Sequence, residues 1–294
     1  MGHSYTLEAS PFRAGGVDLV VTGVWSDQAR RAIEEGQADG LILNYARGFR
    51  GESIEFIKRL PIRSLDILAR WLDDVEPIYA LSPTLNALAI EVAPHIGVEL
   101  ERLPGLRSLS ANWPQVHGSI HFATRLESFS TYRYGEADLS ILENLAQLNY
   151  LGLKNSPRLE SLQGMASLQW LTTLRVSLAP RLADISDVGH IATTLQEIDF
   201  LACKKVNNIA PVKDCRSLRF FSLSEGGEIS SVGPIANLDL IERLYLYDST
   251  RVMDGDLGPI ASLPRLRDFR MMNRRNYKPT VKEIESAIAR RSNT

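Results

Sequence analysis

The stretch Leu148-Asn-Tyr-Leu151-Gly-Leu153 decides the fold, because its spacing of apolar residues recurs along most of the chain. A first apolar residue is followed by a second after three positions and by a third after two more. This pattern begins again at residues 171, 195, 218, 241 and 266, in steps of 23, 24, 23, 23 and 25 residues. A regular period of this length indicates a solenoid, in which stacked repeats bury a face that no single repeat could bury.

Weaker copies of the pattern precede residue 148. They begin at residues 126, 106, 85, 62, 38 and 16, in the same phase. The sequence therefore predicts twelve repeats of 20–25 residues. The chain has 40 leucines among 294 residues, and the stacked core of the repeats explains this excess.

Each repeat combines a strand with a tight turn. Alternation, as in Leu151-Gly-Leu153, places two apolar side chains on one side of a strand. A small residue follows, and apolar residues then recur every third position, as at Val206, Ile209 and Val212. This spacing is typical of 3₁₀ turns and not of a 3.6-residue helix. The small positions are Ser156, Ala179, Cys203, Gly226 and Ser249.

At this point the chain resembles the leucine-rich-repeat family. The stretch Ile235-x-x-Leu238-x-x-Ile241-x-x-Leu244-x-Leu246 is similar to the internalin type of repeat. The three-residue step from Cys203 to Val206 looks more like the cysteine-containing class found in ubiquitin-ligase adaptors. The resemblance covers about residues 16–272. It implies an α/β fold, a solenoid with a parallel sheet on the concave side and helices or 3₁₀ turns on the convex side.

The chain departs from this family at the small position of the repeat. The family often has Asn there, whose side chain satisfies buried backbone groups, and this chain has Ser, Ala, Cys or Gly. Ser156 and Ser249 can do this in part. Ala179 and Gly226 cannot, so we expect water or neighbouring backbone to serve there.

The connecting segments and the two ends predict helices and caps. We expect convex helices over residues 26–35 and 51–60, and a third around Trp71 within residues 67–81, with tighter turns after Leu148. Residues 1–15 are predicted to form an N-terminal cap and residues 16–272 one continuous solenoid. Residues 273–294 are predicted to form a basic C-terminal cap, with a helix from Val281 to about Arg291 whose residues Val281, Ile284 and Ile288 share one face.

Composition narrows the class of protein. Hydrophobic residues make up 44% and charged residues 23%, which argues against disorder. We find no membrane-spanning run and no signal peptide, and the two cysteines cannot form a disulfide framework. We therefore expect a soluble, cytoplasmic monomer. The net charge of −2 argues against nucleic-acid binding, although residues 265–294 carry nine basic and three acidic residues, a net charge of +6.

No pattern in the sequence predicts catalysis, and we expect no enzyme activity, cofactor or metal. His117 and His121 have the i, i+4 spacing of metal ligands on a helix, but Pro114 and Gly118 favour a turn between strands. Cys203 and Cys215 fall on buried positions of the repeat and are interpreted as packing thiols.

The concave side of the sheet is the candidate binding surface. Its C-terminal half is rich in arginine and aromatic residues, which dominate interface energetics, whereas its N-terminal half is mostly small. An alternative is that its alternating charges pair with each other across neighbouring strands. Trp113, Tyr132 and Tyr134 could extend the aromatic cluster along the strand ends. The candidate partner-binding residues are Tyr132, Tyr150, Arg175, Glu197, Asp199, Phe220, Arg243, Tyr245, Tyr247 and Arg270.

These features predict a non-enzymatic module that binds a protein partner on the concave face. The alternative is an adaptor or sensor subunit, or a delivered effector, that acts through the basic C-terminal segment. A secreted adhesin, which the internalin resemblance would allow, is disfavoured by the lack of a signal peptide and an anchor.

Overall fold

The computed structural model describes residues 4–10 and 14–292, and it divides into two compact units, residues 1–131 and 132–294. The prediction of one continuous solenoid over residues 16–272, with the cap boundaries given above, stays a prediction. Residues 1–3, 11–13 and 293–294 of the predicted caps lie outside the described residues.

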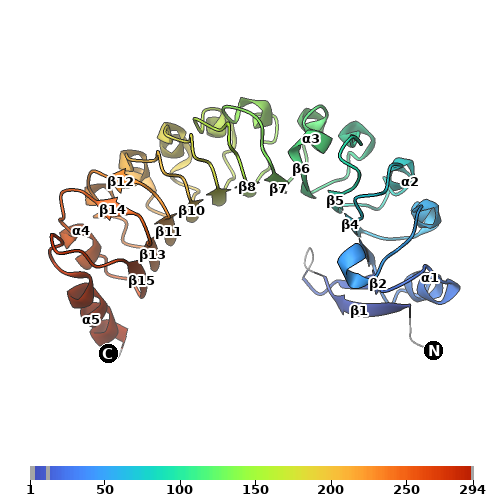
Figure 1. Ribbon diagram of the computed structural model, residues 1–294, viewed down its shortest axis with the longest axis horizontal. Coiled ribbons are helices and arrows are strands. Elements are labelled where there is room, and N and C mark those ends of the chain that lie inside the picture. The colour runs from blue at the N-terminus through green and yellow to red at the C-terminus, as the bar shows by residue number, and fades with distance from the viewer. Residues whose placement is uncertain (1–3, 11–13, 293–294) are drawn as a thin grey trace. The chain divides into compact units, whose positions relative to one another are not determined.

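The strands of the first unit follow each other through the sheet in chain order (Figure 1). The pairs from β2 to β6 are parallel, with the repeat positions in register, so that Leu41 faces Leu65 and Leu65 faces Leu88. The strands are β1 (Tyr5–Ala9), β2 (Val17–Val21), β3 (Gly40–Asn44), β4 (Ser64–Leu68), β5 (Ala87–Glu91), β6 (Ser108–Asn112) and β7 (Ser128–Tyr132), the last of which ends at the boundary between the units.

An antiparallel strand covers the start of the sheet. β1 pairs with β2 in antiparallel fashion, from Tyr5 opposite Val21 to Ala9 opposite Val17. The sequence predicted a cap here but not its strand, because residues 5–9 lie outside the phase of the repeats.

The first predicted helix is confirmed. Helix α1 (Asp27–Glu34) begins at Ser26, whose hydroxyl accepts a hydrogen bond from the Ala29 amide. Its capping residue is Glu35, and Gly36 follows with φ of +76°, a conformation that glycine adopts readily.

The other two predicted helices are wrong in type or extent. Residues 51–60 contain only the 3₁₀ helix η2 (Glu55–Arg59), because Ile54, Ile57 and Leu60 are buried at a spacing of three. Trp71 lies in a turn after β4, and the helix α2 (Glu76–Tyr79) begins later, with Pro77 in its first turn. The remaining short helices of this unit are η1 (Tyr45–Arg47), η3 (Leu100–Arg102), α3 (Trp113–Val116) and η4 (Ile120–Phe122).

The second unit repeats the strand and turn pattern more regularly. Its sheet strands run in the order β8, β9, β10, β11, β13 and β15, and each neighbouring pair is parallel. All twelve predicted repeat strands are thus present, β2 to β11 with β13 and β15. The strands are β8 (Tyr150–Lys154), β9 (Thr173–Ser177), β10 (Glu197–Leu201), β11 (Phe220–Ser224), β13 (Arg243–Leu246) and β15 (Asp268–Met271).

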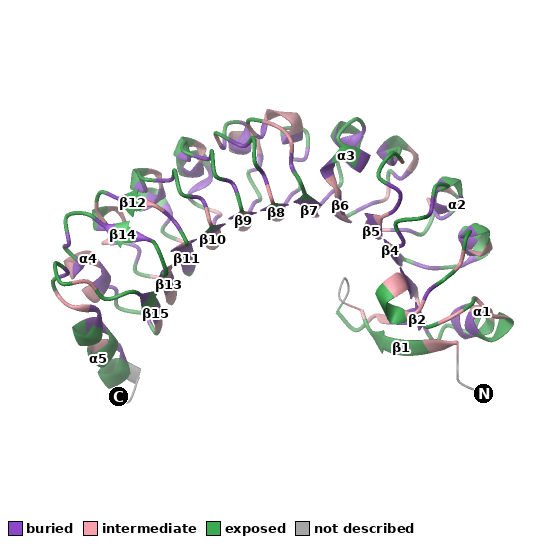
Figure 2. Cartoon of the chain, viewed as in Figure 1, coloured by how far each residue is buried: buried purple, intermediate pink, exposed green. Residues whose placement is uncertain are grey.

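Within this unit the strands line the inner side of the curve, and the turns lie on its outer side (Figure 1). Buried residues fill the layer between them, and the outer turns are largely exposed (Figure 2). The outer elements are η5 (Ser140–Leu142), η6 (Met165–Ser167), η7 (Ser186–Ile191), η8 (Ala210–Asp214), η9 (Gly233–Ile235), α4 (Gly258–Ala261) and the paired strands β12 (Glu228–Ile229) and β14 (Arg251–Val252).

A row of short polar side chains supports these turns. In each repeat an Asp, Ser or Asn accepts a hydrogen bond of 2.9–3.1 Å from the backbone amide two residues later. These side chains recur every 23 or 24 residues, a spacing that the sequence itself carries. The row is Asp138, Ser161, Asp184, Asn208, Ser231 and Asp254.

The small position of the repeat shifts by one residue near the C-terminus. Ser156, Ala179, Cys203 and Gly226 are buried as predicted, but Ser249 is exposed and Thr250 is buried in its place. The Thr250 hydroxyl donates to the Leu223 carbonyl over 2.6 Å and accepts from the Gly226 amide over 3.0 Å. A side chain of the next repeat therefore satisfies the backbone where Gly226 cannot.

Helix α5 (Val281–Ser292) is present as predicted, with Val281, Ile284 and Ile288 buried. Near its C-terminal end the Arg291 guanidinium donates to the carbonyls of Leu263 and Ala261 over 2.6 and 2.8 Å. Part of the basic character of this segment therefore serves to attach the helix.

Candidate functional site

The outward side chains of β8 to β15 form the concave face of the second unit. Each strand presents three outward positions, and parallel register aligns them into rows that cross the sheet. Many side chains of the first two rows contact each other across the strands.

Charged residues of the first two rows pair across neighbouring strands, as the alternative interpretation predicted. Glu197 on β10 lies between two arginines. Its carboxylate is 3.3 Å from the Arg175 guanidinium on β9 and 2.9 Å from that of Arg243, two strands further on. Asp199, the second outward residue of β10, faces Arg175 and Ser222 in the register but forms no ion pair among the described residues.

The Phe220 ring is covered by its neighbours, which corrects the prediction of an exposed aromatic cluster. Only 6% of Phe220 is exposed. The Arg243 guanidinium lies 4.4 Å from the ring centroid, and the Tyr245 ring packs edge-on at 5.1 Å. Phe220 therefore supports the side chains of the face. The sequence could not show this, because the residues that cover the ring lie on another strand, β13.

Tyr245, Asp268 and Arg270 complete this network. The Tyr245 hydroxyl donates to the Asp268 carboxylate, and this hydrogen bond raises the pKa of Tyr245. The Arg270 guanidinium lies 4.5 Å from the Tyr245 ring centroid and 3.5 Å from the Asp268 carboxylate. The first two rows from β9 to β15 thus form one chain of contacts in which most charges are paired.

Several side chains of the third row are exposed. Tyr247 is 49% exposed and Tyr132, at the end of β7, is 43% exposed, whereas Tyr150 is half-buried. The proposed extension through Trp113 and Tyr134 is wrong, because both side chains are buried, at 3% and 0% exposure. Partner binding by the ten candidate residues stays a prediction.

The prediction missed three exposed apolar side chains at the carboxyl ends of other strands of this face. Leu201 and Met272 occupy the same third row, and Leu178 comes one residue after the row on β9. Their exposed fractions are 39%, 45% and 45%. The period of two already predicted that Leu201 and Met272 face outward. An apolar residue at an outward position could therefore have identified both as exposed.

A backbone feature follows each of these strands. The first residue after the third row adopts positive φ between 51° and 63° in six successive repeats, and none of the six is glycine. In five of these repeats the amide of this residue donates to a backbone carbonyl of the next repeat, as Leu178 does to Leu201 over 2.9 Å. The residues are Arg133, Asn155, Leu178, Ala202, Glu225 and Asp248.

The first unit carries a separate aromatic cluster after its strands. Trp71 packs near Phe49 and Tyr45, at centroid distances of 6.4 and 6.2 Å, and its indole donates to the Gly51 carbonyl over 2.9 Å. Trp25 stacks on Phe56 at 4.3 Å. These residues follow different strands and have no common spacing, so the repeat pattern did not reveal them.

The sheet of the first unit also holds a carboxyl with an altered pKa. Burial raises the pKa of Asp66 to about 6, and the nearby Asp18 carboxyl adds to this effect. Asp18 is itself buried and accepts a hydrogen bond from the Ser64 hydroxyl over 3.0 Å. In register, Gly40 lies between Asp18 and Ser64, and its missing side chain leaves the space for this hydrogen bond.

The residues considered for catalysis do not assemble into a site. The sequence predicted a turn around His117, but this residue directly follows the short helix α3. Pro114 stands in the first turn of α3, where no amide donor is needed. Burial raises the pKa of both Cys203 and Cys215 to about 12, which disfavours the reactive thiolate. Among the residues that the structure describes, no group of three or more His, Cys, Asp or Glu could hold a metal ion.

The basic C-terminal segment is partly engaged within the chain. Arg267 pairs with Glu242, Arg270 pairs with Asp268, and Arg291 attaches α5. Arg265, Arg275 and Lys282 are exposed. No helix of the described chain is both long and apolar enough to cross a membrane.

Solved structures with this arrangement of strands and turns identify the fold. An internalin (InlF) from Listeria monocytogenes aligns with 88% of this chain and 83% of its own, at 17% identity and a TM-score of 0.59. The chain has a leucine-rich-repeat fold. A TDR receptor structure aligns with 85% of this chain and 46% of its own, at 14% identity and a TM-score of 0.60. No family model matches the sequence, and no curated protein matches it.

Proposed function

We propose that this leucine-rich-repeat protein is a non-enzymatic module that binds a protein partner on the concave face of its second unit. The observation that supports the proposal is the organisation of this face. Two rows of side chains are held in place by ion pairs and ring contacts, and the third row leaves large apolar side chains exposed beside them. A surface with ordered side chains loses little conformational entropy on binding.

The exposed aromatic and arginine side chains suit this role. Tyr247, Arg175 and Arg270 belong to the residue types that carry most binding energy in interfaces. We propose further that the protein acts as a monomer in the cytoplasm, where its two free, buried cysteines would remain reduced. Cell fractionation tests the location.

The experiment is affinity capture from the native host, followed by mass spectrometry. The wild type is compared with Arg175→Ala/Tyr247→Ala, and with Trp170→Ala as a control for loss of an exposed aromatic outside the face. Trp170 is 67% exposed, so its removal leaves the core intact. We expect the double variant to lose one or more partners that the control retains. Equal capture by all three proteins would contradict the proposal.

An adaptor, sensor or effector role through the basic segment is the second candidate. It is supported by the exposed Arg265, Arg275 and Lys282 on a segment of net charge +6. Binding through these residues would weaken strongly with salt, because exposed charges are screened within about 8 Å at physiological ionic strength.

A further inference from the structure

Basic side chains gather on the loops that follow strands β8, β9 and β10 of the second unit. Three of them occupy the same position in successive repeats, two residues after the buried small residue, and these are Arg158, Arg181 and Lys205. Lys154 ends β8 and Lys204 directly precedes Lys205, and all five side chains are exposed. We call these five residues the basic edge.

Backbone hydrogen bonds hold the three loops side by side. The Asn155 amide donates to the Ser177 carbonyl over 2.9 Å, which joins the first loop to the second repeat. The Leu178 amide donates to the Leu201 carbonyl over 2.9 Å, which joins the second loop to the third repeat. Because neighbouring strands lie about 4.8 Å apart, the three loops together span about 10 Å where the strands end.

The three loops carry an excess of positive charge. We count from the last outward residue of each strand to the residue that caps the next turn. Residues 154–161, 177–184 and 201–208 then contain five basic and two acidic residues, a net charge of +3. With the remaining outward residues of the three strands included, the net charge is still +2.

Both acidic residues of these loops are engaged within the chain. Glu160 lies 3.5 Å from the Arg181 guanidinium, and Asp184 accepts a hydrogen bond from the backbone amide two residues later over 2.9 Å. Among the residues that the structure describes, no ion pair or hydrogen bond is found for the side chains of the other four members of the basic edge, Lys154, Arg158, Lys204 and Lys205. These four cations are therefore available to a negatively charged partner.

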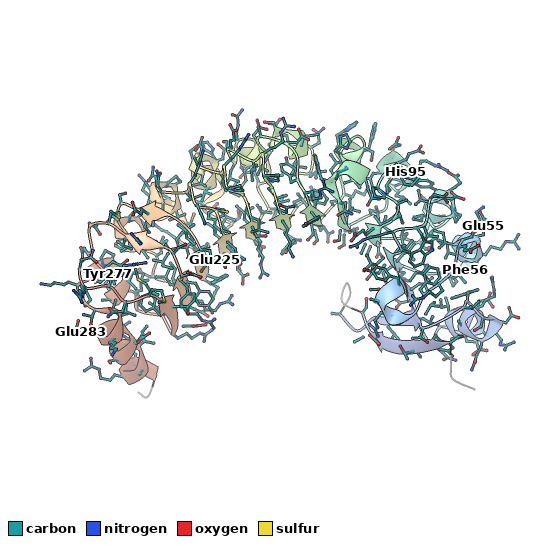
Figure 3. The ribbon with its side chains drawn as sticks, viewed as in Figure 1. Glu55, Phe56, His95, Glu225, Tyr277 and Glu283 are labelled. Carbon is teal, nitrogen blue, oxygen red and sulfur yellow. The ribbon has the colours of Figure 1, made fainter. Side chains whose placement is uncertain are left out.

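Acidic loops border the basic edge on both sides. Beyond β10, residues 224–231 contain two acidic residues and no basic one, and Glu225 among them is labelled in Figure 3. Residues 247–254, one repeat further on, have a net charge of −1, and so do residues 132–138 before β8. The positive surface is thus limited to the three loops.

This limited width selects against long polyanions. Double-stranded DNA carries a negative charge about every 1.7 Å along its axis, so it would continue over the acidic loops and be repelled there. An anionic membrane surface likewise extends beyond the three loops. A short acidic segment of a protein can place its charges on the basic edge and end before the acidic border.

Two apolar side chains on the same loops favour a peptide as well. Leu178 follows β9 and Leu201 ends β10, and their exposed fractions are 45% and 39%. In strand order they lie between Lys154 and Lys204. Phosphate groups would leave these leucines uncovered, whereas an apolar side chain of a peptide can cover them.

We propose that the basic edge binds a short acidic segment of the protein partner, in which a large apolar residue stands among the acidic ones and contacts Leu178 and Leu201. The inference rests on the proposed function, since the segment belongs to the partner that the adjoining concave face binds. The cations supply charge complementarity, and the two leucines supply an apolar contact that a purely charged ligand cannot use.

Three synthetic peptides of nine residues test the inference by fluorescence anisotropy at low salt. The first has a central leucine between acidic residues, the second has lysine in place of the acidic residues, and the third has serine in place of the leucine. We expect the first peptide to bind at least tenfold more tightly than the second and about threefold or more tightly than the third. Equal binding of the lysine peptide or the serine peptide would overturn the inference.

A duplex DNA of twenty base pairs and vesicles that contain phosphatidylserine represent the longer polyanions. We expect neither of them to displace the first peptide when each is added at the same concentration of negative charge. Displacement by the DNA or by the vesicles would show that the basic edge prefers a polyanion to a short acidic segment, and the inference would be wrong.

A charge variant locates the binding of the first peptide. Arg158→Gln/Lys204→Gln should weaken it at least fivefold. The matched control is Lys213→Gln/Arg216→Gln, which removes the same charge from exposed residues outside the basic edge and should change the affinity less than twofold. Both variants replace exposed side chains, and circular dichroism checks that they fold. An equal effect of the two variants would contradict the assignment of the basic edge.

An apolar variant tests the contact with the two leucines. Leu178→Ser/Leu201→Ser should weaken the first peptide about threefold or more and leave the serine peptide unchanged. Trp170→Ser is the control, because it removes an exposed apolar side chain that precedes β9 at the opposite end of the strand. If the leucine variant binds the first peptide as tightly as the wild type does, the apolar residue of the segment has no role and the inference fails.

Failure of this inference is distinguishable from failure of the proposed function. If Arg175→Ala/Tyr247→Ala loses a captured partner but the acidic peptide does not distinguish the basic-edge variant from its control, only the inference about the acidic segment is wrong. If capture by Arg175→Ala/Tyr247→Ala is unchanged, the proposed function is wrong, whatever the peptides show.

Discussion

Phe220 and Tyr247 lie two rows apart on the same face, and they differ in how far their side chains are exposed. Phe220 is 6% exposed beneath Arg243 and Tyr245, whereas Tyr247 is 49% exposed. We expect Phe220→Ala to lower the free energy of unfolding by about 2–4 kcal/mol, because a covered ring is lost, and Tyr247→Ala to change it by less than about 0.5 kcal/mol. Urea unfolding followed by circular dichroism measures both. A larger loss for Tyr247→Ala than for Phe220→Ala would contradict the assignment of Phe220 as the supporting residue.

Asp66 gives a prediction of pH dependence. Its pKa of about 6 in the folded protein exceeds the ordinary value of 3.8, so the folded state binds this proton more tightly than the unfolded state. Its contribution to stability is therefore greatest below pH 4 and is lost as the pH rises through 6. A shift of about two pH units corresponds to about 3 kcal/mol.

Asp66→Asn removes this titration. We expect the variant to be more stable than wild type at pH 7.5 by about 1–3 kcal/mol, with a smaller difference at pH 4. Thermal unfolding at the two pH values checks the result, and Asp239→Asn serves as an exposed control. A variant that gains equally at both pH values would show that burial of the ionised carboxylate is not the cause.

These residues also show where prediction from sequence stops. Outward position followed from the period of two, so the orientation of Phe220, Tyr247 and Asp66 was predictable. Their exposure was not predictable, because the groups that cover Phe220 come from a strand more than twenty residues away. The pKa of Asp66 likewise depends on its burial in the fold and on the Asp18 carboxyl of another strand. Local pattern determines which side a residue faces, and tertiary contacts determine what it meets there.

At the scale of elements, Gly40 on β3 is fixed by its two neighbours. A Cβ at this position would lie 1.9 Å from an Asp18 carboxylate oxygen and 2.1 Å from the Ser64 hydroxyl. We expect Gly40→Ala to lower the free energy of unfolding by about 2–3 kcal/mol, because the hydrogen bond between Asp18 and Ser64 must break or the strands must separate. Denaturant unfolding checks this. Gly23→Ala is the control, since a Cβ there would meet no heavy atom within 4 Å.

Thr250 links two successive repeats of the second unit. Thr250→Val keeps the shape but leaves the buried Gly226 amide without its acceptor, and we expect a loss of about 1–3 kcal/mol. Thr250→Ser keeps the hydroxyl and should lose less. Hydrogen exchange at the Gly226 amide provides a local measurement, and unchanged protection in Thr250→Val would rule out this hydrogen bond as the link.

The elements differ in how far sequence specified them. The strands were predictable because Leu151 and Leu153, and their equivalents, repeat the same buried positions twelve times. Helix α1 was predictable because Ser26 and Gly36 mark its two ends. The segments 51–60 and 67–81 lacked such marks, and the structure has the 3₁₀ helix η2 in the first and a turn followed by the short helix α2 in the second. At the candidate site, the outward rows were predictable but the choice of exposed residues within them was not.

At the scale of the whole molecule, the distribution of charge separates the two proposed functions. Residues 265–294 carry a net charge of +6, and the remaining residues carry −8. Arg267, Arg270 and Arg291 are engaged within the chain, so the charge available to a partner rests largely on other residues of the segment. The variant Arg265→Gln/Arg275→Gln/Lys282→Gln lowers the net charge of the segment to +3 and replaces only exposed side chains.

We expect this triple variant to fold with wild-type stability and to retain every partner lost by Arg175→Ala/Tyr247→Ala. The reason is that the concave face of the second unit contains none of the three substituted residues. Capture at 50 mM and 300 mM salt, with quantitative mass spectrometry, measures the retention. If instead the triple variant loses the partners that the face variant keeps, and wild-type capture falls steeply with salt, then the basic segment is the binding site and the adaptor or effector function replaces the one proposed here.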